Sequence, residues 1–126
     1  MKGQQINRIV KALDRHINRK MIAVAMNLTA ELRERTPIDT GWARSNWIPT
    51  VISPAEGTVG SRESVTYGAQ NAGIASLAGY MSSMGPIYIT NRVPYLPRLN
   101  NGSSSQAPAR FVEAAVDRVL AQEKVI

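Results

Sequence analysis

The sequence contains no cysteine and only one histidine, His16, among its 126 residues. Disulfide scaffolds, thiolate zinc sites, iron-sulfur clusters and cysteine nucleophiles all require cysteine, so these classes are excluded. Metal sites built from several histidines are excluded by the single histidine. The composition favours a protein that is made and assembled inside a cell.

Long apolar runs are also missing. The longest apolar stretch, residues 21–30, contains Asn27 and Thr29 and is shorter than the roughly 20 residues that cross a bilayer. Charged residues follow it where a signal peptide has a small-residue cleavage site, so we expect neither a signal peptide nor contact with a membrane. With 44% hydrophobic and 19% charged residues, the chain is predicted to form a single domain over 1–126.

Residues 1–36 are predicted to form one long, basic amphipathic helix. No glycine or proline interrupts residues 4–36, and apolar residues recur every three or four positions. This apolar series consists of Ile6, Ile9, Val10, Leu13, Ile17, Met21, Val24, Leu28 and Leu32. A helix of about 30 residues is roughly 45 Å long, more than a domain of this size needs. Pro37 ends it, because proline disfavours helix at the preceding residue.

The segment 37–67 is predicted to form a turn and a β-hairpin. Alternating side chains predict a strand over 43–52, followed by a loop over 53–57 and a weaker returning strand over 58–67. A glycine-rich connector follows over 68–85. Its apolar residues keep helical spacing, so we expect a short helix within it.

The segment 86–99 is predicted to hold a strand and a proline-rich exit. Its run 87–90 is β-branched and aromatic, which favours a strand in the same sheet. Residues 91–97 are expected to be extended, because each proline disfavours helix at the residue before it.

A C-terminal helix is predicted over 105–124, with Pro108 in its first turn and Ser105 or Ala107 as its cap. Together the elements predict an α+β fold. The N-terminal and C-terminal helices pack on a small, mainly antiparallel β-sheet, and the short helix lies in the middle connector.

The positive charge is concentrated in the first helix. The formal net charge is +6, and residues 1–36 carry eight basic and three acidic side chains, a net charge of +5. A stripe beside the apolar series is formed by Arg8, Lys11, Arg15 and Arg19. Such a stripe suits contact with DNA phosphates or an acidic partner, or it is a solvated helix face. No base-reading motif accompanies it, so a solvated face or a protein contact is favoured.

No set of residues is typical of a catalytic or cofactor site. His16 lies within the predicted helix, and no Gly-x-Ser-x-Gly motif supplies a serine partner. The carboxylates have no spacing typical of a calcium loop or a metal pair. The glycines of the connector match neither the dinucleotide fingerprint nor the phosphate-binding loop. We therefore expect a binding or structural protein without cofactor or metal, not an enzyme.

Two motifs carry a resemblance to a known family. The first is a Thr-Pro-x-Asp-Thr-Gly turn followed by a tryptophan, formed by Thr36, Pro37, Asp39, Thr40, Gly41 and Trp47. The second is an Asn-x-x-Pro-Tyr strand exit followed by a glycine and a Ser-Gln-Ala-Pro helix start, formed by Asn91, Pro94, Tyr95, Gly102, Ser105, Gln106, Ala107 and Pro108. In this order, after a basic helix, the motifs resemble the tail-component, or tail-completion, family encoded among the head-tail joining genes of long-tailed bacteriophages.

The resemblance implies a structural virion protein of the neck or upper tail, made in the host bacterial cytoplasm. It implies a ring of copies that completes the tail or joins it to the head. The partners would be tail terminator or tail tube proteins and the head-tail connector. Non-specific contact of the basic helix with packaged DNA is a hypothesis. Two alternatives stay open, a small basic nucleic-acid-binding module and a capsid or tail decoration protein.

Overall fold

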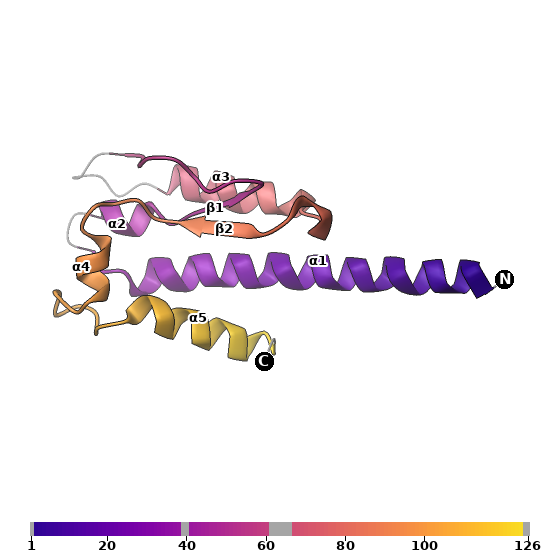
Figure 1. Ribbon diagram of the computed structural model, residues 1–126. Coiled ribbons are helices and arrows are strands. Elements are labelled where there is room, and N and C mark those ends of the chain that lie inside the picture. Colours follow the sequence, from indigo (N-terminus) through magenta and orange to yellow (C-terminus); the bar gives the residue numbers. More distant parts are fainter. Residues whose placement is uncertain (1, 39–40, 61–66, 125–126) are drawn as a thin grey trace.

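The computed structural model describes residues 2–38, 41–60 and 67–124 (Figure 1). The expected α+β class is confirmed, with long N-terminal and C-terminal helices, a short middle helix and a two-stranded antiparallel sheet. The elements in chain order are α1 (Lys2–Arg35), α2 (Trp42–Ser45), β1 (Ile48–Val51), α3 (Gly68–Ser76), η1 (Leu77–Gly79), η2 (Ser82–Met84), β2 (Ile87–Thr90), α4 (Leu96–Asn100) and α5 (Phe111–Gln122).

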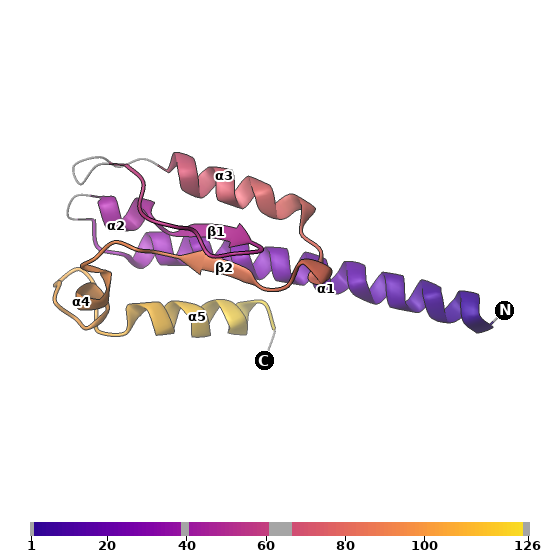
Figure 2. The ribbon, with the colours of Figure 1, turned by 45° about the horizontal axis from the view of Figure 1, so that its top comes forward.

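Helix α1 is the longest helix of the molecule. Its 34 residues span about 51 Å at 1.5 Å per residue. The C-terminal half of α1 packs against α5 and both strands, whereas the N-terminal half projects beyond every other element (Figures 1 and 2). The predicted long helix is therefore present, and nearly half of it lies outside the packed part of the molecule.

The core lies between the C-terminal half of α1, the sheet and α5. One cluster joins Leu32 of α1, Trp47 and Ala115 of α5. A second cluster, of Trp42, Ala43 and Val93, lies between α2 and the segment that follows β2. These clusters show that the packed part of the molecule, which we name the body, lies at the C-terminal end of α1.

The expected strand over 43–52 is wrong at its start, because Trp42–Ser45 form the short helix α2 and β1 begins only at Ile48. Gly41 has a φ of 81° and leads into α2. Trp42 and Ala43 are both buried although they are adjacent. A strand places neighbouring side chains on opposite faces, so two adjacent buried side chains fit a helix that is buried on several sides.

The expected hairpin partner of β1 is also wrong. β1 pairs antiparallel with β2, in a register from Ile48 opposite Thr90 to Val51 opposite Ile87. Residues 58–60 and 67 of the expected returning strand are not strand, and residues 61–66 lie outside the described residues. The side chain of Asn46 binds both backbone groups of Val59, with N···O distances of 2.9 Å. These bonds occupy the groups that a strand partner needs.

The end of the chain differs from prediction in two places. Residues 96–100 form α4 instead of an extended exit, because Pro97 lies in the first turn, where its missing N–H is not needed. The last helix begins at Phe111, so Pro108 and the expected caps precede it. Arg110 is its N-cap, with a φ of 62°, and the N–H of Arg110 donates to the carbonyl of Asn100 at 2.6 Å.

Candidate functional site

The first sequence motif is built around Thr36, directly after α1. The Thr36 hydroxyl donates to the carbonyl of Leu32 at 2.6 Å and accepts from the Trp47 indole N–H at 2.7 Å. The Thr36 carbonyl accepts from two nitrogens of the Arg44 guanidinium, at 3.1 and 3.0 Å. Thr36 is fully buried, and these bonds satisfy its polar groups. The motif therefore fixes the direction of the chain as it leaves α1.

The second motif binds directly to the first. The Asn91 amide donates to the carbonyl of Ala43 at 2.8 Å, and its oxygen accepts from the N–H of Val93 at 3.1 Å. The Gln106 side chain accepts from the N–H of Ile38 at 3.0 Å. Side chains of the second motif thus hold backbone of the first, and we name the joined structure the motif cluster.

Aromatic and glycine positions complete the motif cluster. The rings of Tyr95 and Trp42 lie 5.9 Å apart at an angle of 52°. Gly41 and Gly102 have φ values of 81° and 94°, which favour glycine. A Cβ on Gly102 would also approach that of Ala109 to 3.2 Å. These positions therefore support the backbone conformation of the motif cluster.

The remaining described motif positions are either buried or exposed. The buried ones are Pro37 and Ala107, and the exposed ones are Pro94, Ser105 and Pro108. Asp39 and Thr40 lie outside the described residues.

The cap of α5 was missed by sequence reasoning. The Asn100 side chain accepts from the N–H of Val112 at 2.9 Å and donates to the Glu113 carboxylate at 2.7 Å. This exchange satisfies a free N–H in the first turn of α5, as an N-cap side chain does. Asn100 belongs to α4, so no local cap pattern in the sequence indicates it.

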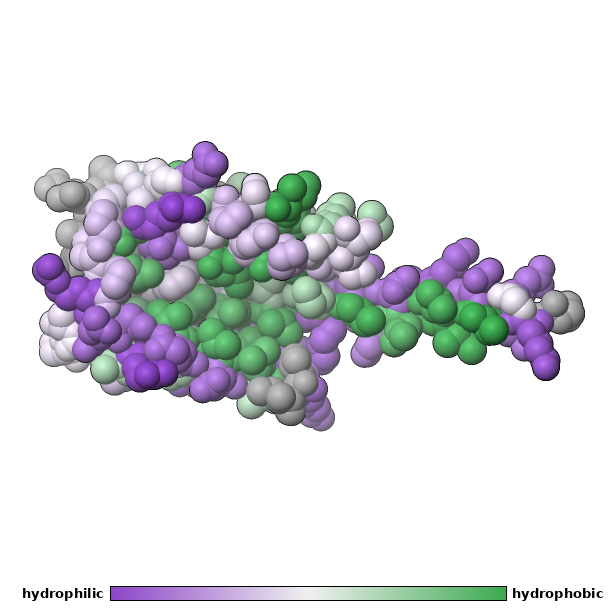
Figure 3. Space-filling model, in the orientation of Figure 1, coloured by the Kyte–Doolittle hydropathy of each residue, from purple (hydrophilic) through white to green (hydrophobic). Residues whose placement is uncertain are grey.

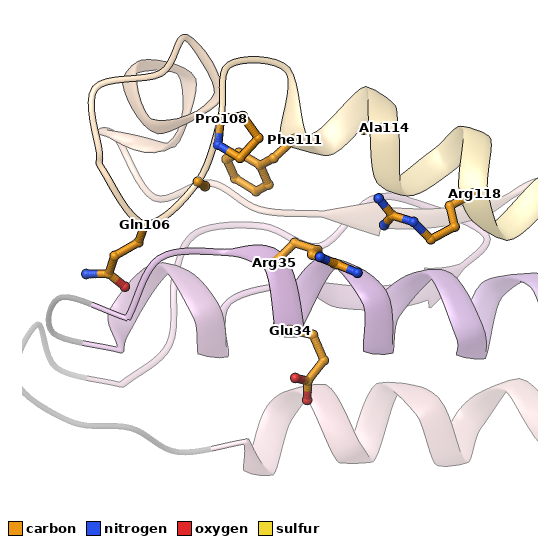
Figure 4. A pocket seen from close by; sticks show the side chains of 8 residues that line it. Glu34, Arg35, Gln106, Pro108, Phe111, Ala114 and Arg118 are labelled. Carbon is orange, nitrogen blue, oxygen red and sulfur yellow. The ribbon is translucent and has the colours of Figure 1, made fainter.

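A hollow of about 190 Å³ lies beside the motif cluster, between the end of α1 and α5 (Figure 4). Its eight lining residues are Glu34, Arg35, Gln106, Ala107, Pro108, Phe111, Ala114 and Arg118. None of these is a serine, threonine, histidine or lysine, and only one is a carboxylate. The hollow therefore offers no pair of nucleophile and base.

The two arginines of this hollow are paired with Glu31. Its carboxylate accepts from Arg35 at 3.0 Å and also from Arg118. Burial raises the pKa of Glu31, but the hydrogen bonds and charges of Arg35 and Arg118 outweigh burial and hold this pKa below its ordinary value. Glu31 thus neutralises cations that an anionic ligand would otherwise use, and ties α5 to α1.

The projecting half of α1 presents a row of exposed apolar side chains. We name residues 2–17 the arm, because every one of them is exposed. Its apolar side chains are 39% to 66% exposed and form the arm stripe: Ile6, Ile9, Val10, Leu13 and Ile17. Figure 3 shows this stripe along the arm.

The arm stripe is costly to leave in water. Complete burial of a Val, Leu or Ile side chain contributes about 1.5–3 kcal/mol, so covering five half-exposed ones contributes on the order of 5 kcal/mol. This cost favours an arm that is covered in an assembly.

The stripe of Arg8, Lys11, Arg15 and Arg19 is exposed along its whole length. At 3.6 residues per turn these positions fall on the side of α1 opposite the arm stripe, not beside it as expected from the sequence. The arm therefore has two separate faces, one apolar and one basic, which suit different partners.

The body continues the apolar surface of the arm. Figure 3 shows hydrophobic residues gathered over α1, β2 and α5 and running without a break into the arm stripe. We name this surface the body face. The half-buried apolar side chains of these elements include Met21, Val24, Leu28, Ile89, Val112, Val116 and Leu120. Of these, Leu28, Ile89 and Val112 pack against the core cluster of Leu32, Trp47 and Ala115.

Side chains that bind metal ions do not gather in the described part of the chain. No group of three or more His, Asp or Glu residues there is placed to hold a metal ion. His16 is exposed on the arm and borders a shallow hollow with Arg19, Lys20 and Glu123. Within the same residues, no helix is long and apolar enough to cross a membrane.

Comparison of the chain with family models, with curated proteins and with solved structures finds no match. Function is therefore argued from the two features built above, the motif cluster and the two-faced arm.

Proposed function

We propose that this chain is a structural subunit of the neck or upper tail of a long-tailed bacteriophage. It completes the tail or joins it to the head as one member of an oligomeric ring. The observation that carries the proposal is the arm, a helix with an exposed apolar stripe that the described part of the chain leaves uncovered. The partners beyond the ring are tail terminator or tail tube proteins and the head-tail connector.

The motif cluster supports the same proposal. Its polar groups are used to hold the turn after α1 against α2 and the second motif, as the bonds of Thr36, Asn91 and Gln106 illustrate. A turn fixed in this way sets the direction of α1, and hence of the arm, relative to the body. A subunit that must meet identical neighbours at one angle needs such a rigid base. The role proposed here is structural, not enzymatic.

Electron microscopy of a phage lysate tests this function. The reading frame is deleted from the phage that encodes it, and the particles are compared with those of a complemented deletion. Filled heads separated from tails, or tails with defective ends, are the expected result. Normal joined virions would overturn the proposal. The number of subunits per particle separates a neck ring, with few copies, from a decoration protein, with hundreds.

A nucleic-acid-binding module is the second candidate, because the basic stripe points away from the apolar one and is fully exposed. Binding that depends on phosphate contacts weakens by orders of magnitude between low and physiological salt. A titration of the purified chain with duplex DNA at several salt concentrations tests this candidate. Weak binding at all of them would leave the basic stripe to a protein partner.

A further inference from the structure

The arm stripe and the body face are both apolar, and they are similar in length. The arm of 16 residues is about 24 Å long, and the part of α1 below the body face, residues 18–35, is about 27 Å long. Each copy of the chain carries one of each. A contact between the two surfaces would therefore cover apolar side chains of both.

We propose that the arm of one copy lies on the body face of a second copy, with Ile9 and Leu13 of the arm at the centre of the contact. The inference rests on the proposed function in one respect, that the chain assembles with copies of itself. If the second copy returns the contact, the result is a closed dimer, and if it passes the contact on, the result is a ring. In both arrangements every arm and every body face is covered.

Charge favours a contact of arm with body over a contact of arm with arm. The arm carries four basic side chains and one acidic, so two arms packed together would bring like charges within a Debye length. Helix α5, at the edge of the body face, carries two acidic side chains and one basic. The body half of α1, residues 18–35, carries four basic and two acidic side chains, so the elements of the body face together have a net charge of +1, against +3 for a second arm.

The same placement leaves the basic stripe of the arm outside the contact. Arg8 and Lys11 lie on the opposite side of α1 from the arm stripe, so they point away from the copy that covers it. The apolar face then joins copies, while the basic face remains available to a third component.

Size-exclusion chromatography with light scattering on the full chain tests the inference. The arm variant combines Ile9→Glu and Leu13→Glu. Its matched control combines Asn7→Glu and Ala12→Glu, which make the same change in charge at exposed arm positions off the arm stripe. The face variant is Leu120→Glu, with Val116→Glu as a second choice if circular dichroism shows that Leu120→Glu unfolds the body.

We expect the unchanged chain and the matched control to form a dimer or larger ring, and the arm and face variants to be monomers. The dissociation constant of each variant should rise at least about 100-fold, as expected when side chains at the centre of an interface are lost. An equimolar mixture of the arm and face variants is the decisive sample. One intact arm and one intact face remain in it, so the mixture should form a 1:1 complex.

Four results would overturn the inference. A face variant that still assembles on its own would show that arms pack on arms, and a mixture that stays monomeric would show that an intact arm does not bind an intact body face. An unchanged chain that is monomeric at its highest soluble concentration, or an arm variant that still assembles, would show that a second copy does not cover the arm. None of these results affects the neck assignment, which depends on the particles made by the deletion phage.

Discussion

The two halves of α1 share one apolar repeat and lie in opposite surroundings. In the body, Leu32 is 2% exposed and packs against Trp47 and Ala115. In the arm, Leu13 is 55% exposed, although it belongs to the same series of apolar positions. The repeat thus indicates that a helix face is to be covered, but not whether the cover comes from the same chain. In this protein the body covers its own half, and we propose that a second copy covers the arm.

Matched truncations in the two halves should give the largest difference. Leu32→Ala removes a buried side chain from the core and should lower the free energy of unfolding by about 2–5 kcal/mol. Leu13→Ala should change it by less than about 0.5 kcal/mol in the monomer, because the side chain is exposed. Urea denaturation of both variants at a concentration where the chain is monomeric measures this. A comparable loss for Leu13→Ala would mean that the arm is already covered within one chain.

Glycine-to-alanine substitutions compare how tightly the body and the arm are packed. A Cβ at Gly73 in α3 would lie 2.5 Å from the carbonyl oxygen of Pro49, so Gly73→Ala should cost about 1–3 kcal/mol. Gly3 in the arm has no atom within 4 Å of its Cβ position, and Gly3→Ala should stabilise the helix by up to about 1 kcal/mol. Thermal unfolding followed by circular dichroism measures whether each substitution raises or lowers stability. A loss at Gly3 equal to that at Gly73 would contradict an open arm.

The two helices that meet in the body, α1 and α5, differ in how their N-terminal ends are stabilised. Helix α5 is capped by Asn100 from another helix, whereas the first turn of α1 has no acidic residue to stabilise it. Asn100→Ala should destabilise the body by about 1 kcal/mol, because the N–H of Val112 loses its acceptor. Asn101→Ala, at the exposed neighbouring position, is the control. Equal stability of the two variants in urea would show that the cap contributes nothing.

The sequence predicts the features that depend on local pattern. The helical repeat predicts α1, the short helix α3 and the last helix, and the β-branched run 87–90 predicts β2 at its observed bounds. It does not predict that β1 pairs with β2, because pairing across so long a connection depends on the body core. The cap by Asn100 and the bonds between the motifs are long-range in the same way. The arm stripe was visible as a repeat, but its exposure was not.

The smallest expected change in stability follows from removing the ion pairs of Glu31. Asp14 in the arm is the exposed carboxylate with which Glu31 is compared. The pKa of Glu31 is lowered in the folded chain, so its contribution to stability is complete above the ordinary glutamate pKa of about 4.3 and is lost as the pH falls through the lowered value. At pH 7, Glu31→Gln should cost about 1 kcal/mol, because Arg35 and Arg118 lose their acceptor. Asp14→Asn makes the same change in charge at an exposed arm position and should leave the stability of the body unchanged. Urea midpoints of the unchanged chain and of Glu31→Gln should converge as the pH falls through the lowered pKa, and a difference that persists once Glu31 is protonated would mean that packing, not charge, connects α1 to α5 at this point.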